Sequence, residues 1–232
     1  MVLREAEFLI ELSHECITKL QGFVEDTSKD KLWLVFPWQD NGDLRDFLAS
    51  RDWEIPERIW LIDNVVEGVE YLHDQKPPIC HGDLKSLNIL VNSECRALIT
   101  DFGSARPPLE LTFCDSTSTI TLTGNKYTLR WAAPELLMED QLGLWSDIWA
   151  MGWIFYEVIT NAIPFQDIQT DLVVIQRVIQ GDLPSITDHA RMSLIWELCS
   201  LIIECWNIEP RKRPTAKDCR KVIAWMVSKA GL

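Results

Sequence analysis

The sequence predicts an α+β fold in which a small part with strands is followed by a larger, mainly helical part. Two short runs near the start, 17–24 and 32–36, read as strands, and the polar residues 25–30 between them read as a hairpin turn. From residue 56 onward apolar residues recur at helical spacing, and several prolines separate the periodic stretches. These observations together favour a single domain with its strands concentrated in its first part.

The first elements follow from the same patterns. Residues 1–12 are predicted to form a helix, because Ala6, Leu9 and Ile10 fall on one face. The Asp-Asn-Gly sequence at 40–42 is typical of a turn, and a short helix is expected after it over residues 43–49.

The helical part begins at Pro56, a residue suited to the first turn of a helix. The apolar residues of this helix recur every three or four positions: Ile59, Ile62, Val66, Val69 and Leu72. Pro77 and Pro78 end it. Four more helices are expected, over residues 146–160, 170–180, 191–206 and 216–228.

Composition narrows the classes of function. The 232 residues carry a formal net charge of -13, so the chain as a whole repels nucleic acid and anionic membranes. The longest apolar stretch, 148–156, is far shorter than the roughly 18 residues that a membrane span needs. Seven cysteines, an odd number without a close C-x-x-C pair, argue against a zinc site or a disulfide framework. We therefore expect an intracellular, cytoplasmic protein without a membrane span.

One ordered segment carries the strongest chemical signal. It reads His-Gly-Asp-Leu-Lys-Ser-Leu-Asn over 81–88 and Asp-Phe-Gly over 101–103. Phosphoryl transfer requires a carboxylate that orients the attacking hydroxyl, a cation near the transferred phosphate and oxygen ligands for Mg²⁺. The segment supplies this set in four residues: Asp83, Lys85, Asn88 and Asp101.

Taken singly, each of these residues is a common surface or turn residue, and a lone Asp-Phe-Gly has little specificity. The ordered set is far more specific. Two short strands joined by a tight turn would bring Asn88 and Asp101 to one place, where an amide oxygen and a carboxylate suit Mg²⁺. The sequence therefore predicts a magnesium site at that end of the strands.

The chain resembles the protein kinase family, and the resemblance covers essentially its whole length. Beyond the segment above, three motifs match the family: Ala-Pro-Glu at 133–135, Asp-Ile-Trp-Ala-Met-Gly at 147–152, and Cys-Trp at 205–206 followed by Arg-Lys-Arg-Pro-Thr at 211–215. The resemblance implies that Asp147 begins the central buried helix of a large lobe. It also implies that Arg213 forms a buried ion pair with Glu135.

The resemblance further implies a protein-kinase-like fold with an incomplete small lobe over 1–38, made of helix C and about two strands, and a large lobe over 39–232. Glu5 stands where the family has its helix-C glutamate. The implied ATP-binding residues are a gatekeeper, two hinge residues and a residue under the adenine ring: Phe36, Pro37, Gln39 and Leu90. Pro37 is compatible with the hinge because only its carbonyl is needed there.

Two residues indicate the substrate. Lys85, two residues after Asp83, is typical of the serine/threonine kinases, as is Thr128, six residues before Pro134. The resemblance thus implies transfer of the γ-phosphate of ATP, with Mg²⁺, to Ser or Thr of protein substrates in signal transduction.

Two features depart from the family pattern. Gly82 replaces the usual arginine before Asp83, which makes control through a phosphate on the activation loop less expected. The loop still carries seven hydroxyl residues: Thr112, Ser116, Thr117, Ser118, Thr119, Thr121 and Thr123. The second departure is that neither a Gly-rich loop nor a strand with the phosphate-anchoring lysine precedes Glu5.

These departures leave alternatives open. One is a pseudokinase or scaffold that acts as a protein-interaction module. Another is a small-molecule phosphotransferase of the aminoglycoside kinase type, in which His-Gly-Asp is common. Lys85, Ala-Pro-Glu at 133–135, Asp147 and Arg213 favour a protein kinase over the latter.

Overall fold

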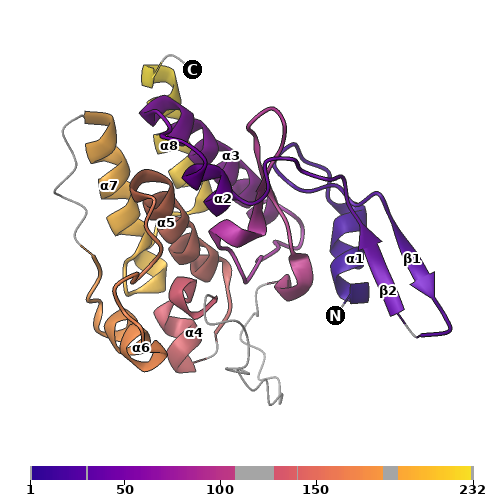
Figure 1. Cartoon of the computed structure of the whole chain (residues 1–232). Helices are drawn as coiled ribbons and strands as arrows, with labels where there is room; N and C mark the ends of the chain where they lie inside the picture. Colours follow the sequence, from indigo (N-terminus) through magenta and orange to yellow (C-terminus); the bar gives the residue numbers. More distant parts are fainter. Residues whose placement is uncertain (1, 30, 108–127, 140, 185–192, 231–232) are drawn as a thin grey trace.

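The structure is a computed structural model, and it describes residues 2–29, 31–107, 128–139, 141–184 and 193–230 (Figure 1). The seven loop hydroxyls between Thr112 and Thr123 lie outside the described residues. The predicted α+β fold class is confirmed: a small strand-containing part lies beside a larger part built almost wholly of helices.

The small part consists of helix α1 (Val2–Glu11) and the hairpin of β1 (Gly22–Asp26) and β2 (Lys31–Val35). The strands are antiparallel, with Gly22 opposite Val35. The first strand starts five residues later than the run 17–24 predicts. Ile17 instead forms an isolated parallel bridge with Ile99, a tertiary pairing that local sequence cannot reveal.

Two capped helices follow the hairpin. In α2 (Leu44–Ala49) the Asp43 side chain accepts a hydrogen bond from the backbone N–H of Asp46. In α3 (Ile55–His73) Glu54 and Glu57 form a capping box, and Pro56 stands in the first turn, where its missing N–H is not needed.

A second hairpin, β3 (Ile89–Val91) with β4 (Ala97–Ile99), follows α3. Its strands are antiparallel, and Ile89 lies opposite Ile99. One 3₁₀ turn, η1 (Ser86–Asn88), leads into β3, and another, η2 (Phe102–Ser104), follows β4. The residues that flank the hairpin on both sides therefore meet at its open end.

The remaining helices form the large part. They are η3 (Thr128–Trp131), α4 (Pro134–Glu139), α5 (Leu144–Thr160), α6 (Asp171–Gln180), α7 (Ser193–Cys205), η5 (Pro210–Lys212) and α8 (Ala216–Ala230). Helix α5 runs through the middle of this part and contacts α3 and α7, while α8 packs along α3 (Figure 1). Trp149, Trp153 and Phe155 of α5 are completely buried, so the core centres on this helix.

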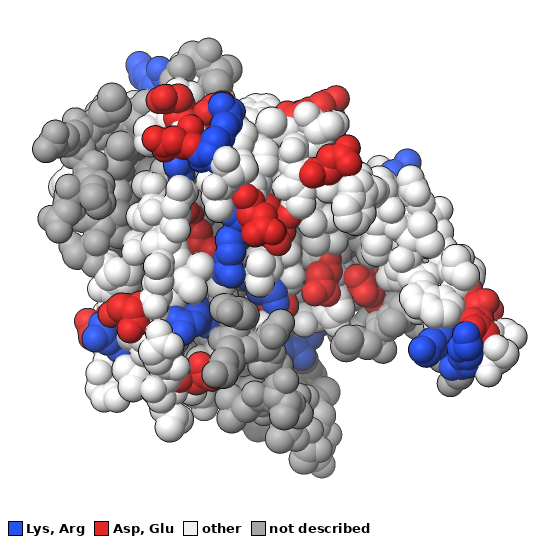
Figure 2. Space-filling view, in the orientation of Figure 1, with Lys and Arg blue, Asp and Glu red and all other residues white. Residues whose placement is uncertain are grey.

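The surface differs between the two parts. Phe23 of β1 is 65% exposed and Trp33 of β2 is 46% exposed, whereas Trp149, Trp153 and Phe155 of α5 are inside. On the face drawn in Figure 2, acidic and basic side chains of the described residues lie close together over the large part. Within the described ranges, no helix is both long and apolar enough to cross a membrane.

Candidate active site

Three predicted catalytic residues lie together on the loop between α3 and β3. Lys85 Nζ is 2.6 Å from Asp83 Oδ2, and Asn88 Nδ2 donates to the same oxygen at 3.0 Å and to the Asp83 carbonyl at 2.9 Å. The 3₁₀ turn η1 brings Asn88 back toward the start of the loop, because its N–H donates to the Lys85 carbonyl. The carboxylate of Asp83 is thus oriented from two sides.

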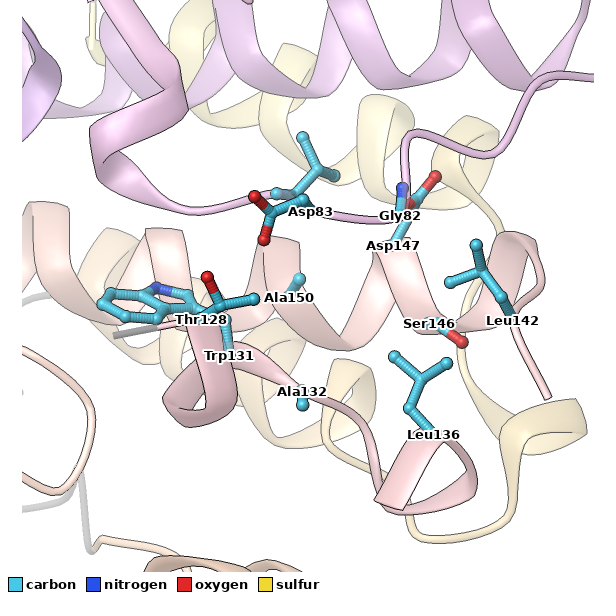
Figure 3. A pocket seen from close by; sticks show the side chains of 11 residues that line it. Gly82, Asp83, Thr128, Trp131, Ala132, Leu136, Leu142, Ser146, Asp147 and Ala150 are labelled. Atoms are coloured by element: carbon cyan, nitrogen blue, oxygen red, sulfur yellow. The ribbon is translucent and has the colours of Figure 1, made fainter. Parts of the chain in front are cut away.

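Thr128 reaches this group from a distant part of the chain. Lys85 Nζ donates to Thr128 Oγ1 at 3.0 Å, so one ammonium group bridges the loop and η3. Asp83 and Thr128 both line a small cavity of about 50 Å³, and Figure 3 shows them at the opposite end from Leu142 and Ser146. Lys85 is only 8% exposed, which strengthens its interaction with the carboxylate.

Asp101 follows β4 at the open end of the same hairpin. Thr100 N–H donates to the Asn88 carbonyl, which places the chain around Asp101 beside Asn88. Asp101 is exposed and has a left-handed backbone (φ 62°), an uncommon conformation for a residue other than glycine that is often found at functional sites. Across the described ranges no three His, Cys, Asp or Glu side chains gather as a metal cluster. The Asn88 amide and the Asp101 carboxylate are the oxygen groups that could hold a hard cation here.

Glu5 of α1 faces the Asp-Phe-Gly turn. Burial raises the pKa of the Glu5 carboxyl, the Asp101 carboxylate raises it further, and the backbone N–H of Phe102 lowers it. The charge that raises the Glu5 pKa is therefore the like charge of Asp101.

The predicted adenine-binding residues line the connection between the two parts. Phe36 and Leu90 are half-buried, and Phe36 packs against the core. Gln39 Nε2 donates to the Pro37 carbonyl at 3.3 Å. Leu90 of β3 is held beside this connection by a backbone bridge to Asp43.

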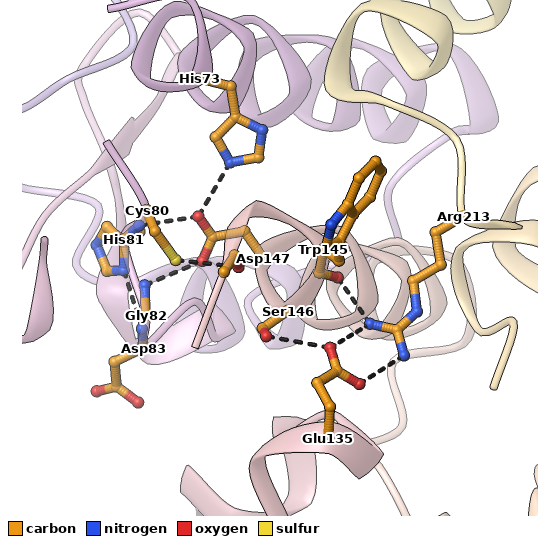
Figure 4. A network of polar contacts seen from close by, with 11 residues as sticks. His73, Cys80, His81, Gly82, Asp83, Glu135, Trp145, Ser146, Asp147 and Arg213 are labelled. Carbon is orange, nitrogen blue, oxygen red and sulfur yellow. Dashed lines mark hydrogen bonds and ion pairs between the residues drawn. The ribbon is translucent and has the colours of Figure 1, made fainter. Parts of the chain in front are cut away.

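Asp147 fixes the backbone just before Asp83. The His81 N–H donates to Asp147 Oδ2 at 2.8 Å and the Gly82 N–H donates to Oδ1 at 2.9 Å, while His73 Nε2 lies 3.0 Å from Oδ2 (Figure 4). Burial alone would raise the pKa of Asp147, but the contacts with His73, His81 and Gly82 outweigh it and hold the pKa below its usual value.

Glu135 and Arg213 form a bidentate ion pair, with Nη1–Oε1 and Nη2–Oε2 distances of 2.6 and 2.8 Å (Figure 4). Ser146 Oγ also donates to Glu135, and Arg213 donates to the carbonyls of Trp145 and Asn207. The pair ties α4 to the segment before α8, and fork-to-fork geometry of this kind is strong.

Gly82 occupies a position that disfavours side chains. Its φ is +79°, and a Cβ built on it would lie 2.9 Å from Leu142 Cδ2 and 3.1 Å from the Ser104 carbonyl oxygen. A side chain here would therefore adopt a strained backbone conformation and would have to displace Leu142.

Glu157 is a site residue that sequence reasoning missed. Its Oε2 accepts from Ser86 Oγ on the catalytic loop and its Oε1 from Trp131 Nε1 on η3, both at 2.6 Å. Burial raises the pKa of Glu157 to about 7, although Ser86, Trp131 and Arg45 lower it. The sequence carried one signal that could have identified this residue: Glu157 and Asp147 are the only charged residues in the otherwise largely apolar helix α5.

The model of the protein kinase domain matches residues 1–224. This chain belongs to the protein kinase domain family. The ordered residues from Asp83 to Arg213 therefore stand in a kinase fold, and the resemblance seen in the sequence is confirmed.

Relatives of this kinase domain include two kinds of protein kinase by name. The tyrosine-protein kinase TXK of Mus musculus is 28% identical over 224 residues, which cover 95% of this chain and 40% of TXK. The probable serine/threonine-protein kinase roco6 of Dictyostelium discoideum is 28% identical over 247 residues, 97% of this chain and 11% of roco6. The MAP3K epsilon protein kinase 2 of Arabidopsis thaliana is 30% identical over 219 residues, 93% of this chain and 15% of that protein. The chain thus spans less than half the length of these relatives.

Proposed function

We propose that this kinase domain transfers the γ-phosphoryl group of ATP to Ser or Thr hydroxyls of protein substrates. The observation that carries the proposal is the position of Lys85 Nζ, 2.6 Å from Asp83 Oδ2 and 3.0 Å from Thr128 Oγ1. The Lys85 ammonium group thus donates hydrogen bonds to both the Asp83 carboxylate and the Thr128 hydroxyl. This chemistry depends almost entirely on such positioning and on electrostatic stabilisation.

Each residue has a distinct role in the proposed reaction. Asp83 accepts a hydrogen bond from the substrate hydroxyl and takes its proton as the oxygen bonds to the γ-phosphorus and the bond to the β-phosphate oxygen breaks. Lys85 stabilises the negative charge that develops on the transferred group. Thr128 holds Lys85 in place through its hydroxyl.

Asn88 and Asp101 are the proposed magnesium ligands. An amide oxygen and a carboxylate at one end of the β3–β4 hairpin fit a hard cation that prefers oxygen. When bound, Mg²⁺ would neutralise charge on the phosphates and orient them. The exposed Asp101 carboxylate leaves room for this role.

The adenine ring would lie between the hinge and Leu90. Gln39 Nε2 uses one lone pair of the Pro37 carbonyl, so the second lone pair is free for the amino group of adenine. The N–H of Gln39 would complete the pair of hinge bonds, and half-buried Phe36 would limit the depth of the pocket.

Ser/Thr substrates are favoured over tyrosine by Lys85 and Thr128, because both take part in the catalytic group. The division into a small lobe over 1–38 and a large lobe over 39–232, a role in signal transduction and a cytoplasmic location belong to the same proposal.

A scaffold without catalysis is the alternative candidate function, and the similarity to named protein kinases does not favour it. This candidate expects partner binding without phosphate transfer.

The test is to incubate the purified chain with Mg²⁺, γ-labelled ATP and myelin basic protein, and then to identify the labelled amino acid. We expect phosphoserine or phosphothreonine, and no label with Asp83→Asn. Phosphotyrosine would overturn the substrate assignment. The absence of label with the unsubstituted chain would favour the scaffold.

A further inference from the structure

Arg130 of η3 is a buried cation that binds backbone rather than a carboxylate. It is 9% exposed. Its Nη1 donates to the carbonyls of Pro164 at 2.9 Å and Phe165 at 2.5 Å, and its Nη2 donates to the Ile168 carbonyl at 2.7 Å. Three acceptors from one five-residue stretch make this a specific clamp, because the planar guanidinium holds its donors in a fixed geometry.

The clamped stretch belongs to the turn 161–168 between α5 and α6, and the turn is strained. Asn161 and Phe165 both have left-handed backbones, with φ of 56° and 52°. For a bulky residue such as Phe165 this conformation is unfavourable and persists only when its surroundings impose it. Burial against Trp153 fixes the Phe165 ring, and Arg130 fixes its carbonyl.

The same short 3₁₀ helix is anchored on both sides of Arg130. Thr128 contacts Lys85 of the catalytic loop, and Trp131 donates to Glu157. Arg130 therefore connects the turn 161–168 to the segment that closes the catalytic group. The turn and the catalytic group are thus both anchored to η3.

The turn 161–168 also lines an open pocket of about 430 Å³. Its lining includes Ile163, Phe165, Gln166 and Asp167 from the turn and Arg177 from α6. The shape of this surface depends on the backbone that Arg130 holds. A surface that is joined to η3 through Arg130, and that has both apolar and charged groups, suits contact with a protein.

We propose that Arg130 is a positioning residue for the protein substrate: it locks the turn 161–168 against η3, and the locked turn is part of the substrate-binding surface. The proposal rests on the proposed kinase function. It assigns Arg130 an effect on protein-substrate affinity and none on the reacting atoms, because none of its three bonds involves Asp83, Lys85 or Asn88.

The first measurement needs no catalysis. Hydrogen exchange of the turn 161–168 is compared among the unsubstituted chain, Arg130→Met and Arg130→Lys, with exposed Arg211→Met as the matched control. We expect faster exchange in Arg130→Met and an intermediate rate in Arg130→Lys, whose single ammonium replaces only part of the clamp. Strand β3 should be unchanged in all variants, which shows that the fold is intact. Unchanged exchange of the turn in Arg130→Met overturns the proposal.

The second measurement is affinity for myelin basic protein, titrated in an Asp83→Asn background so that no turnover occurs. We expect Arg130→Met to weaken binding about 10-fold, the size of effect typical for charged hydrogen bonds, and Arg211→Met to leave it unchanged. Equal affinities, or no binding by the chain that retains Arg130, overturn the proposal.

Kinetics separate this proposal from the proposed function. In an active chain, Arg130→Met should raise KM for the protein about 10-fold and leave kcat and KM for ATP within about twofold. A fall in kcat alone overturns the proposal. If the chain transfers no phosphate but its affinity still responds to Arg130→Met, the kinase function fails and the role of Arg130 in protein binding stands.

Discussion

The large helical part and the small part around the β1–β2 hairpin are stabilised very differently. In the large part Trp149 and Trp153 are completely buried, and Asp147 and Arg213 have several partners each. In the hairpin, the two strands pair with each other and with no other described strand, and Phe23 is 65% exposed. A two-stranded hairpin is marginally stable on its own, so the small part gains little from its own packing.

This difference shows which part of the molecule holds the catalytic residues in place. Among the described residues, the hydrogen bonds that hold the catalytic group come from the large part and join Asp83, Lys85, Asn88 and Thr128. The small part adds Glu5 and Phe36, which we propose lie on the side where the nucleotide binds. We therefore expect a substitution that destabilises the hairpin to weaken ATP binding more than it disturbs the catalytic group.

The largest effect is expected in the large part, at Arg213. Arg213→Met leaves the Glu135 carboxylate, only 11% exposed, without its partner, and should lower the free energy of unfolding by about 4 kcal/mol. Denaturant titration measures this. The matched control is Lys212→Met, which breaks the exposed pair with Glu209 and should cost less than about 1 kcal/mol. Similar losses for the two variants would contradict the account.

A pH dependence is expected from Glu157, because its pKa of about 7 in the folded chain lies above its ordinary value of 4.5. The folded state binds this proton more tightly, so the contribution of Glu157 to stability is greatest at low pH and is lost as the pH rises from about 4.5 to about 7. The loss is on the order of 3 kcal/mol.

Glu157→Gln should remove this step, because glutamine does not titrate and can still bond to Ser86 and Trp131. Unfolding titrations at pH 5 and pH 8 give the comparison. An equal fall with pH in the unsubstituted chain and in Glu157→Gln would show that other groups cause it.

Gly82→Ala is expected to cost about 2 kcal/mol, because a Cβ there meets Leu142 and the Ser104 carbonyl oxygen and the backbone is left-handed. Gly22→Ala, in the hairpin, is the matched control, since its Cβ meets nothing within 4 Å. Thermal or denaturant unfolding measures both. If Gly82→Ala and Gly22→Ala are equally stable, the claim that Gly82 occupies a position that disfavours side chains is wrong.

The smallest effect is expected in the hairpin itself. Phe23→Thr should change the free energy of unfolding by no more than about 0.5 kcal/mol and should reduce self-association, measured by light scattering. Phe155→Ala, at a completely buried position of α5, should cost about 4 kcal/mol. A large loss in Phe23→Thr would mean that the hairpin is packed as well as the core.

The sequence predicted most where a pattern is local. Helices α3 and α5 follow from apolar periodicity and proline breaks, and the segment 81–88 follows from its motif. The start of β1 was predicted five residues too early, because Ile17 pairs with Ile99 across more than eighty residues.

The contacts of Arg130 and Glu157 could not be predicted for a similar physical reason. Arg130 binds carbonyls, which every residue carries, so no side-chain pattern marks its partners. Glu157 stands in an apolar helix, and its partners Ser86 and Trp131 come from separate segments. Only the tertiary fold brings these groups together.

The most direct test of the central claim is the rate of phosphate transfer from Mg-ATP to a protein, compared between the unsubstituted chain and Asp83→Asn at matched protein concentration. Asp83 is placed as the group that takes the proton of the attacking hydroxyl, so Asp83→Asn should lower the rate at least about 100-fold. Equal rates in the two proteins, or no transfer by the unsubstituted chain even at high concentration, would contradict the claim that this chain catalyses phosphoryl transfer through Asp83.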